Sequence, residues 1–426
     1  MSTAATPRLS RTITFDRSVD WAGLTDLASK WATRNEFSMP RTSRPRSGIQ
    51  VIDLFCGAGG LSAGFEMLGR RTGACVIVGA ADLDPSSAET YEANIGVQPV
   101  CEDLGVTATD SAAFERLLAH IRLDVDRPTI VIGGPPCQGF TAHRKRLWST
   151  SDIRNELVAT FGSIALRLNP EIVVMENVPE LLSEKYWRYF QDYKKMMESA
   201  GYHVSAQIHN LASYGVAQER FRSLIIAART PLGAPAAILE RSKFRTVRQE
   251  IGHLPNVSPG QVCATDPMHR SSLHKPSTIR VIEQVAKDGG SRPKGVGPAS
   301  ADRVDGFRDV YGRLSWDRPS VTITGYARNP ASGRFVHPEQ NRGLTLREAA
   351  LLQGFPRNYT FQGPGDSRFQ QVGNAVPARF SLVLAAHVIR HLADPHYRES
   401  ALPGLTEPAR NSFSSSLPGL KGSGTL

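Results

Sequence analysis

VIDLFCGAGGLSAGF, Val51 to Phe65, carries the strongest indication of how this chain is built. Its apolar first half predicts a buried strand, which runs directly through Gly57, Gly59 and Gly60 into a helix. Glycines let a backbone approach a ligand closely, and a helix N-terminus offers free N–H groups to polar or negative atoms. The residue order differs from the GxGxxG turn of pyrophosphate binders. The stretch therefore predicts a site for another nucleoside ligand, and the alternative is a strand–helix turn with no ligand.

Strand-like and helix-like segments alternate from Gln50 to about residue 230. The apolar runs are IQVIDLF, CVIVGAAD, TIVIGG, EIVVME, HVSAQIHN and RSLIIAA. Helical patterns lie between them at residues 86–94, 112–121, 153–168 and 190–199. Continuously apolar strands separated by helices are typical of a parallel sheet covered on both faces. The predicted fold class is therefore α/β.

The remaining segments differ in composition. Residues 1–47 are basic and punctuated by proline, and we expect a flexible arm in which a short helix over 21–31 is possible. Residues 231–325 replace the α/β rhythm with Pro, Gly, His and basic residues. Regular structure returns within 326–395, which ends in the amphipathic helix FSLVLAAHVIRHL. Residues 396–426, rich in Ser, Gly and Pro, predict a disordered tail.

Composition narrows the classes of partner. The formal charge of +10 and the pI of about 9.5 favour a polyanionic partner. Five cysteines without a CxxC pair argue against a disulfide framework and against a zinc site, so we expect no metal. No apolar run reaches the length of a membrane span, and the N-terminus has no signal-peptide pattern. We expect a cytosolic, reduced protein.

Two carboxylates follow successive strands of the predicted sheet. Asp82 in GAADLDP stands where an acidic residue contacts a ribose in βαβ nucleoside sites, and Asp103 follows the next short strand in CEDL. Either residue alone is more often a helix cap. Because ligands bind at the carboxyl ends of such sheets, their succession favours a binding role.

GGPPCQGF, Gly133 to Phe140, presents a cysteine at the end of a predicted strand. Pro135 and Pro136 stiffen the loop, and the neighbouring glycines permit close approach by another molecule. A rigid loop that presents the Cys137 thiol is how a nucleophile is held for attack. The alternative is that Cys137 is a small buried hydrophobe.

EIVVMENVPELL ends a further strand at Glu176, beside apolar residues whose desolvation raises the pKa of the carboxyl. Arg220 and Arg222 in QERFR lie two positions apart at the start of another strand and so face the same side. They are candidates to hold a phosphate, a base oxygen or Glu176 itself. A purely structural Glu–Arg pair is the alternative.

Taken together, the motifs resemble the bacterial-type DNA (cytosine-5)-methyltransferase family. The matching stretches, which occur in the family's order between Val51 and His391, are DLFCGAGG, GGPPCQGF, ENVPE, QERFR, RPSVTITG…HPEQNRGLTLREAALLQGFP and QQVGNAVP. Glu219 and Phe221 lie at positions where relatives vary. Leu83 stands where many relatives place a large side chain against adenine.

The resemblance implies a Rossmann-like, S-adenosylmethionine-dependent sheet at residues 48–230, a target-recognition domain at 231–325 and a segment at 326–395 that completes the catalytic domain. It implies that Cys137 adds to C6 of a flipped-out cytosine in double-stranded DNA, so that C5 accepts the methyl group. Glu176 would supply a proton at N3, and Arg222, with Arg220 beside it, would fix the base oxygen. The implied cofactor residues are Phe55, Gly57, Gly59, Asp82, Asp103, Asn374 and Val376.

The same resemblance implies a monomer in the bacterial cytoplasm, at the nucleoid, with no membrane contact. Its role is restriction–modification, with a cognate endonuclease as a possible partner, or genome marking. The basic stretch AHRKRLW, residues 142–148, would close over the flipped nucleotide, unless it is only a solvated loop. One rival function is a tRNA cytosine-5 methyltransferase, although the Cys-Phe-Thr signature of those enzymes is missing. The other is a non-catalytic DNA-binding homologue.

Overall fold

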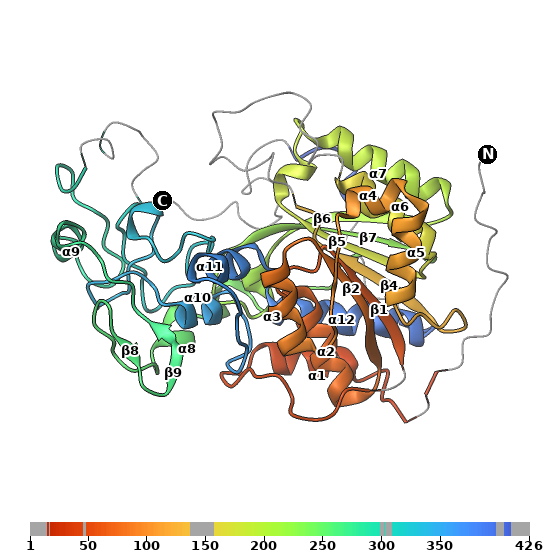
Figure 1. Cartoon of the computed structure of the whole chain (residues 1–426), viewed down its shortest axis with the longest axis horizontal. Helices are drawn as coiled ribbons and strands as arrows, with labels where there is room; N and C mark the ends of the chain where they lie inside the picture. The colour runs from red at the N-terminus through yellow and green to blue at the C-terminus, as the bar shows by residue number, and fades with distance from the viewer. Residues whose placement is uncertain are drawn as a thin grey trace.

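A computed structural model describes residues 15–16, 18–45, 48–136, 157–298, 302, 309–397 and 404–409. Its centre is a seven-stranded sheet in the order β3-β2-β1-β4-β5-β7-β6 (Figure 1). The strands are β1 Ile49–Leu54, β2 Cys75–Asp82, β3 Val100–Cys101, β4 Thr129–Gly133, β5 Ile172–Asn177, β6 His203–Asn210 and β7 Phe221–Ala228. The predicted α/β class is confirmed.

The sheet is mixed, which corrects the expectation of a wholly parallel one. β1, β2, β3, β4 and β5 pair in parallel, but β7 runs antiparallel to both of its neighbours, β5 and β6. The connection from β6 to β7 is too short for the crossover, usually helical, that parallel neighbours require. β7 therefore returns beside β6 as the second strand of a hairpin.

Helices cover both faces of the sheet, because alternate residues of each buried strand point to opposite sides. Ile130 and Ile132 of β4 belong to one hydrophobic cluster, and Val131 belongs to the other. The first cluster includes α1 Leu24–Ala32, α2 Gly60–Thr72, α3 Pro85–Ile95 and α12 Ala378–Ala393. The second includes α4 Leu104–Thr109, α5 Ser111–His120, α6 Leu157–Leu168 and α7 Trp187–Ser199. The four predicted helices are thus present, although residues 153–156 of one lie outside the described ranges.

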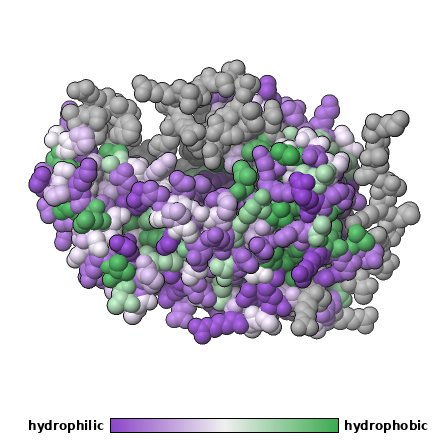
Figure 2. Space-filling view, viewed as in Figure 1, coloured by the Kyte–Doolittle hydropathy of each residue, from purple (hydrophilic) through white to green (hydrophobic). Residues whose placement is uncertain are grey.

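A smaller lobe lies beside the sheet and contains α8 Val247–Ile251, the hairpin of β8 Val262–Cys263 with β9 Asp266–Arg270, and α9 Pro276–Glu283 (Figure 1). Between this lobe and the sheet lie α10 Leu346–Leu352 and α11 Gly365–Asn374. Figure 2 shows that hydrophilic residues predominate on the visible face of the smaller lobe.

A buried guanidinium organises the irregular loops of this lobe. Arg313 is 1 % exposed and donates hydrogen bonds to the carbonyls of Val285, His337, Gln340 and Ile282 at 2.9–3.1 Å. Buried carbonyls outside helices and sheets need such donors, and a guanidinium supplies five N–H groups in one rigid plane. Arg313 thus supplies the hydrogen bonds that backbone N–H groups would supply in a helix or a sheet.

Residues 18–45 are packed on the protein rather than forming the flexible arm that we expected. α1 buries Leu24, Ala28 and Trp31 against α12. The chain then continues past Asn358, whose side-chain oxygen accepts a hydrogen bond from the Met39 backbone N–H at 2.8 Å. Apolar residues at helical spacing explain the helix, but its docking depends on partners more than 300 residues away.

A buried charge network joins this N-terminal segment to both lobes. Glu250 of α8 contacts the Nε of Arg245 at 2.5 Å and the Nη2 of Arg379, on α12, at 3.2 Å, and all three side chains are at most 5 % exposed. Arg245 also donates to the Thr33 carbonyl at 2.7 Å, and Arg379 donates to the Ala32 carbonyl at 2.6 Å. We call these residues, 32–35 with Arg245, Glu250 and Arg379, the junction network.

Part of the predicted disordered tail is also ordered. The backbone N–H of Leu405 donates to Ala206 on the edge strand β6 at 2.8 Å, and that of Ala409 donates to Leu182 at 2.9 Å. Residues 404–409 thereby cover backbone groups that an exposed edge strand would leave unpaired. In the ranges described above, no single helix is long and apolar enough to span a membrane, although the bent pair α11–α12 passes that test jointly.

Candidate active site

A cavity of about 460 Å³ opens at the carboxyl ends of β1, β2, β4 and β5. Its walls include Phe55, Gly57, Asp82, Asp103, Glu176, Asn374 and Val376. The structure therefore brings together most of the residues singled out in the sequence, from segments more than 300 positions apart. Gly134 and Pro136 also line it, so the loop that leads to Cys137 starts at this cavity. Cys137 and residues 142–148 lie outside the described ranges.

The turn after β1 leaves the space for a ligand that its glycines predicted. Gly57 has φ +49°, and nothing lies within 4 Å of the position that a Cβ would occupy there. Phe55 has φ +56°, which is unusual for a residue other than glycine and is a form of strain that often occurs at functional sites. The Gly57 N–H donates to the Asp82 carboxylate at 2.7 Å and so ties the ends of β1 and β2 together.

Gly59 differs from our expectation, because it does not line the cavity. A Cβ on Gly59 would lie 2.8 Å from the Tyr359 hydroxyl and 3.0 Å from the Tyr91 ring. The glycine instead makes room for Tyr359, whose hydroxyl donates to the Ala58 carbonyl at 2.7 Å. Its role in the structure is to let the far end of the chain pack behind the turn.

Asp82 and Asp103 combine the two roles that the sequence left open. Asp82 accepts hydrogen bonds from the backbone N–H groups of Gly57 and Asp84, and burial raises the pKa of its carboxyl. Asp103 caps α4 by accepting from the Gly105 N–H at 2.8 Å. Both side chains nevertheless line the cavity. Capping and access to a ligand are compatible because a carboxylate has more acceptor sites than one cap uses.

Asp53 is a cavity residue that the sequence analysis missed. This β1 residue is 1 % exposed, and its Oδ2 accepts a hydrogen bond from the Ser62 hydroxyl at 2.6 Å. Its Oδ1 has no hydrogen-bond partner among the described residues, and burial raises the pKa of the carboxyl to about 8. A carboxylate inside a largely apolar strand was the available signal. An unpaired buried oxygen on a cavity wall indicates a place for a ligand donor.

Glu176 and Arg222 form the ion pair that the sequence suggested. Arg222 Nε lies 3.1 Å from Glu176 Oε1, in side chains that are 15 % and 10 % exposed. Burial raises the pKa of Glu176, and Arg222 and Arg220 oppose that shift. The geometry is not that of a hydrogen bond, so within the described residues Oε1 still has no hydrogen-bond partner. Arg222 therefore holds Glu176 Oε1 by charge, and the carboxyl lies at the cavity wall.

The end of β5 also holds the beginning of the cysteine loop. Asn177 Nδ2 donates to the Pro135 carbonyl at 3.2 Å. A Cβ on Gly134 would lie 3.9 Å from a Glu176 carboxylate oxygen, so the loop passes directly beside this acid. Two residues beyond Pro135 comes Cys137.

Arg220 has a different place from the one expected. It is 1 % exposed, does not line the cavity, and donates to the carbonyls of Ile323, Gly373 and Ala375 at 3.1–3.3 Å. Because Gly373 and Ala375 flank the cavity residue Asn374, Arg220 positions that wall of the cavity. Its influence on Glu176 is electrostatic only.

A cavity at the strand ends of an α/β sheet, with carboxylates after successive strands, is the arrangement of nucleoside-binding enzymes. Residues 49–390 match the family of C-5 cytosine-specific DNA methylases, and the chain belongs to that family. It is therefore a DNA (cytosine-5)-methyltransferase, as the motifs predicted.

Individual relatives agree with this assignment. The chain is 32 % identical to the type II methylase M.HgiDII of Herpetosiphon aurantiacus over 82 % of its length and 97 % of the relative's. It is 34 % identical to the type II methyltransferase M1.HphI of Haemophilus parahaemolyticus over 80 % and 87 % of the two chains. Its fold resembles a prophage protein from E. coli described as a DNA modification methyltransferase, with a TM-score of 0.61, 22 % identity, and coverage of 82 % and 100 %.

Proposed function

We propose that the enzyme transfers the methyl group of S-adenosylmethionine to C5 of a cytosine flipped out of double-stranded DNA, within one specific sequence. The observation that carries this proposal is the shared cavity. Glu176 lines the same cavity as Asp53, Asp82 and Asp103. A target base and a nucleoside cofactor can therefore meet in one cavity.

The cavity suits this cofactor in its donor chemistry. The unpaired Asp53 oxygen can accept a hydrogen bond from the ammonium group of the cofactor, and Asp82 can accept hydrogen bonds from its ribose hydroxyls. Asp103 would accept from the adenine amino group. Gly57 and Phe55 leave room beside the ligand, while Asn374 and Val376 close the far wall. The cofactor supplies an activated methyl group on a sulfonium sulfur.

The protein's own groups would then perform the covalent chemistry. Cys137, as a thiolate, forms a bond to C6, and the electron pair of the C5–C6 double bond becomes a nucleophile at C5. Glu176 holds a proton at N3 as charge builds there, and Arg222 fixes the base oxygen and stabilises that charge. After C5 has taken the methyl group, a base removes the C5 proton and the C6–sulfur bond breaks, which regenerates the thiolate. Base flipping is required because a paired cytosine shields C5 and C6.

The smaller lobe would read the DNA sequence. Residues 231–325 contain many Lys and Arg residues, which can bind phosphates and guanine edges. The relatives named above are type II enzymes, so we propose a restriction–modification role with a cognate endonuclease, for a monomeric enzyme in the bacterial cytoplasm. Bisulfite sequencing of DNA from cells that express the chain tests the proposal. Methylated cytosine at one recurring sequence is expected, and unmethylated DNA despite abundant folded protein would refute it.

The Asp53→Asn variant is expected to weaken S-adenosylmethionine binding by about 10- to 100-fold, the usual size of a lost charged hydrogen bond. Asparagine keeps an oxygen for the Ser62 hydroxyl, so the local packing is preserved. Calorimetric titration measures the change. The matched control is Asp110→Asn, a helix cap outside the cavity, which should bind normally. Normal affinity in Asp53→Asn would remove this residue from the site.

The Glu176→Gln variant is expected to lower the single-turnover rate by about 10²-fold or more, the usual contribution of a general acid. Burial raises the pKa of Glu176, and the mechanism needs its protonated form. The wild-type rate should therefore fall as pH rises through the pKa of Glu176 in the folded enzyme. This descending limb of the pH–rate profile should be absent in the variant. Unchanged cofactor affinity is the control. A variant that retains the same descending limb would assign that limb to another group.

A further inference from the structure

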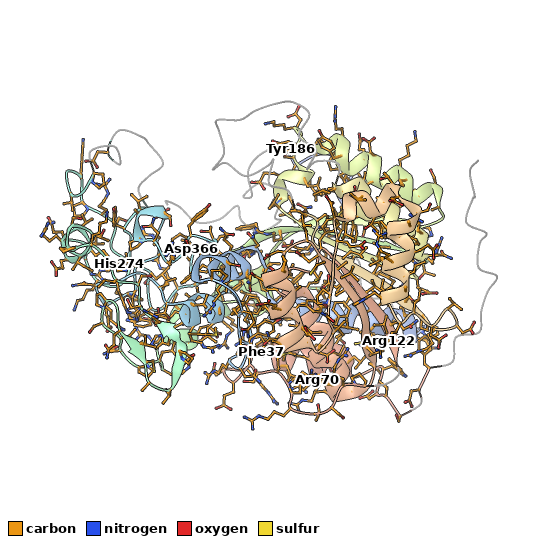
Figure 3. All side chains as sticks on the ribbon, viewed as in Figure 1. Phe37, Arg70, Arg122, Tyr186, His274 and Asp366 are labelled. Atoms are coloured by element: carbon orange, nitrogen blue, oxygen red, sulfur yellow. The ribbon has the colours of Figure 1, made fainter. Side chains whose placement is uncertain are left out.

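A second cavity, of about 330 Å³, lies at the junction of the two lobes. One wall is the end of β9, with Arg270, Ser271 and Ser272. The opposite wall comes from α10 and α11, with Arg368, and from the loop that carries Arg328. Figure 1 places α10 and α11 between the sheet and the β8–β9 hairpin, and Figure 3 labels Asp366, at the start of α11, in this region. We call this cavity the junction pocket.

The junction pocket is lined by three guanidinium groups and two hydroxyls, and none of its lining residues is acidic. Arg328 is paired with Asp366 at 2.7 Å, but both side chains are largely exposed, at 45 % and 67 %, so this pair is weak. Arg368 donates its Nε to the Gly363 carbonyl at 2.6 Å, which orients its guanidinium. Within the part of the chain that the structure describes, the Arg270 side chain has no hydrogen-bond or ion-pair partner.

Like charges gathered around a cavity repel each other unless an anion joins them. Guanidinium groups recognise phosphate oxygens with several hydrogen bonds at once, and serine hydroxyls add neutral donors. Arg270 and Arg368 line this one cavity from two different elements, β9 and α11. The chemistry of the junction pocket is that of a phosphate site.

α11 fixes where this phosphate would lie relative to the reaction. Ser367 and Gln370 of α11 line the active-site cavity, while Arg368 and Phe369 of the same helix line the junction pocket. The two cavities are therefore about one helix diameter apart, roughly 10 Å. The junction pocket thus lies between the smaller lobe and the active-site cavity, the two parts that the proposed function brings into contact with one duplex.

We propose that the junction pocket binds a backbone phosphate of the DNA substrate through Arg270 of the smaller lobe and Arg368 of α11. The proposal rests on the proposed function, because it assumes a bound DNA duplex. Since the two arginines belong to opposite walls, the phosphate links the lobe that reads sequence to the helix that lines the active site. The contact serves DNA affinity and positioning and does not touch the reacting atoms.

The test is the double variant Arg270→Gln/Arg368→Gln. Binding of a fluorescent duplex at increasing salt should show the slope of log affinity against log salt reduced by about one unit, because each lost phosphate contact contributes about 0.9. KM for DNA should rise by about 10- to 100-fold, while kcat at saturating DNA stays within about twofold of wild type. The control Lys30→Gln/Arg122→Gln removes two exposed charges from the part of the protein that contains the sheet, away from the smaller lobe, and should keep the wild-type slope.

A second arm identifies the phosphate. Duplexes in which single phosphates are replaced by neutral methylphosphonates should reveal one position that weakens wild-type binding but does not further weaken the double variant. If no position behaves so, and inorganic phosphate stabilises the wild type but not the variant against heat, the pocket serves a small anion and the proposal is overturned. An equal loss of slope in the Lys30→Gln/Arg122→Gln control would also overturn it. The single variant Arg270→Gln changes an exposed residue, so a loss of binding in this variant cannot be attributed to misfolding. A wild type that methylates no DNA would instead refute the proposed function.

Discussion

Replacing Cys137 with serine is expected to abolish methyl transfer, with a loss of ~10⁴-fold or more, as for other covalent nucleophiles. A serine hydroxyl has a pKa far above that of a thiol and cannot add to C6 at neutral pH. The structure supports this assignment through the residues that lead to Cys137, because Asn177 fixes Pro135 and Gly134 passes beside Glu176. Transfer of tritium from labelled S-adenosylmethionine to DNA measures the effect.

Two further measurements make the Cys137→Ser result specific. A covalent complex with DNA that contains 5-fluorocytosine should form with the wild type and not with the variant. Cys75→Ser is the matched control, since the Cys75 thiol donates to the Phe65 carbonyl inside the core and a hydroxyl can do the same. Substantial transfer by Cys137→Ser, together with normal trapping, would assign the nucleophile to another residue.

Replacing Glu250 with glutamine is expected to destabilise the folded protein by about 3–5 kcal/mol, the usual effect of removing one partner of a buried ion pair. Glu250 is the carboxylate between Arg245 and Arg379, and its loss leaves two buried guanidinium groups without a counter-charge. Chemical denaturation followed by circular dichroism measures the change. The control Glu240→Gln breaks only an exposed contact with Lys243 and should unfold like the wild type. Equal stability of the two variants would show that the network is solvated in solution.

The parts of the fold that follow local rules could be read from the sequence. The turn after β1 needs the left-handed conformation of Gly57, and the apolar runs of β1, β4 and β5 need cover on both faces. Glu176 was recognisable as an acid at the end of an apolar strand, where burial raises the pKa of its carboxyl. These features depend on residues close together in the chain.

The features that escaped prediction depend on distant partners. The apolar pattern of β7 does not show whether the strand runs parallel or antiparallel to its neighbours, because its direction follows from the short connection after β6. The docking of α1 depends on contacts with α12, at the far end of the chain. Arg220 and Arg222 are two positions apart and were expected to face the same side, yet Arg220 binds backbone carbonyls and Arg222 contacts Glu176. Only the packing of residues 323–375 around Arg220 separates the two roles.

The junction network has a consequence for the evolution and redesign of specificity. An exchange of recognition segments between relatives that began near residue 235 would carry Arg245 and Glu250 away from Arg379, from the Thr33 carbonyl and from the Asn35 side chain, which remain behind. A transplant that begins after Ile251 would keep that contact native and replace only the loops beyond it. The boundary of the segment that can be exchanged to change specificity therefore lies inside the smaller lobe. Residues 32–35 help to define this boundary, although they precede the family match, which begins at residue 49.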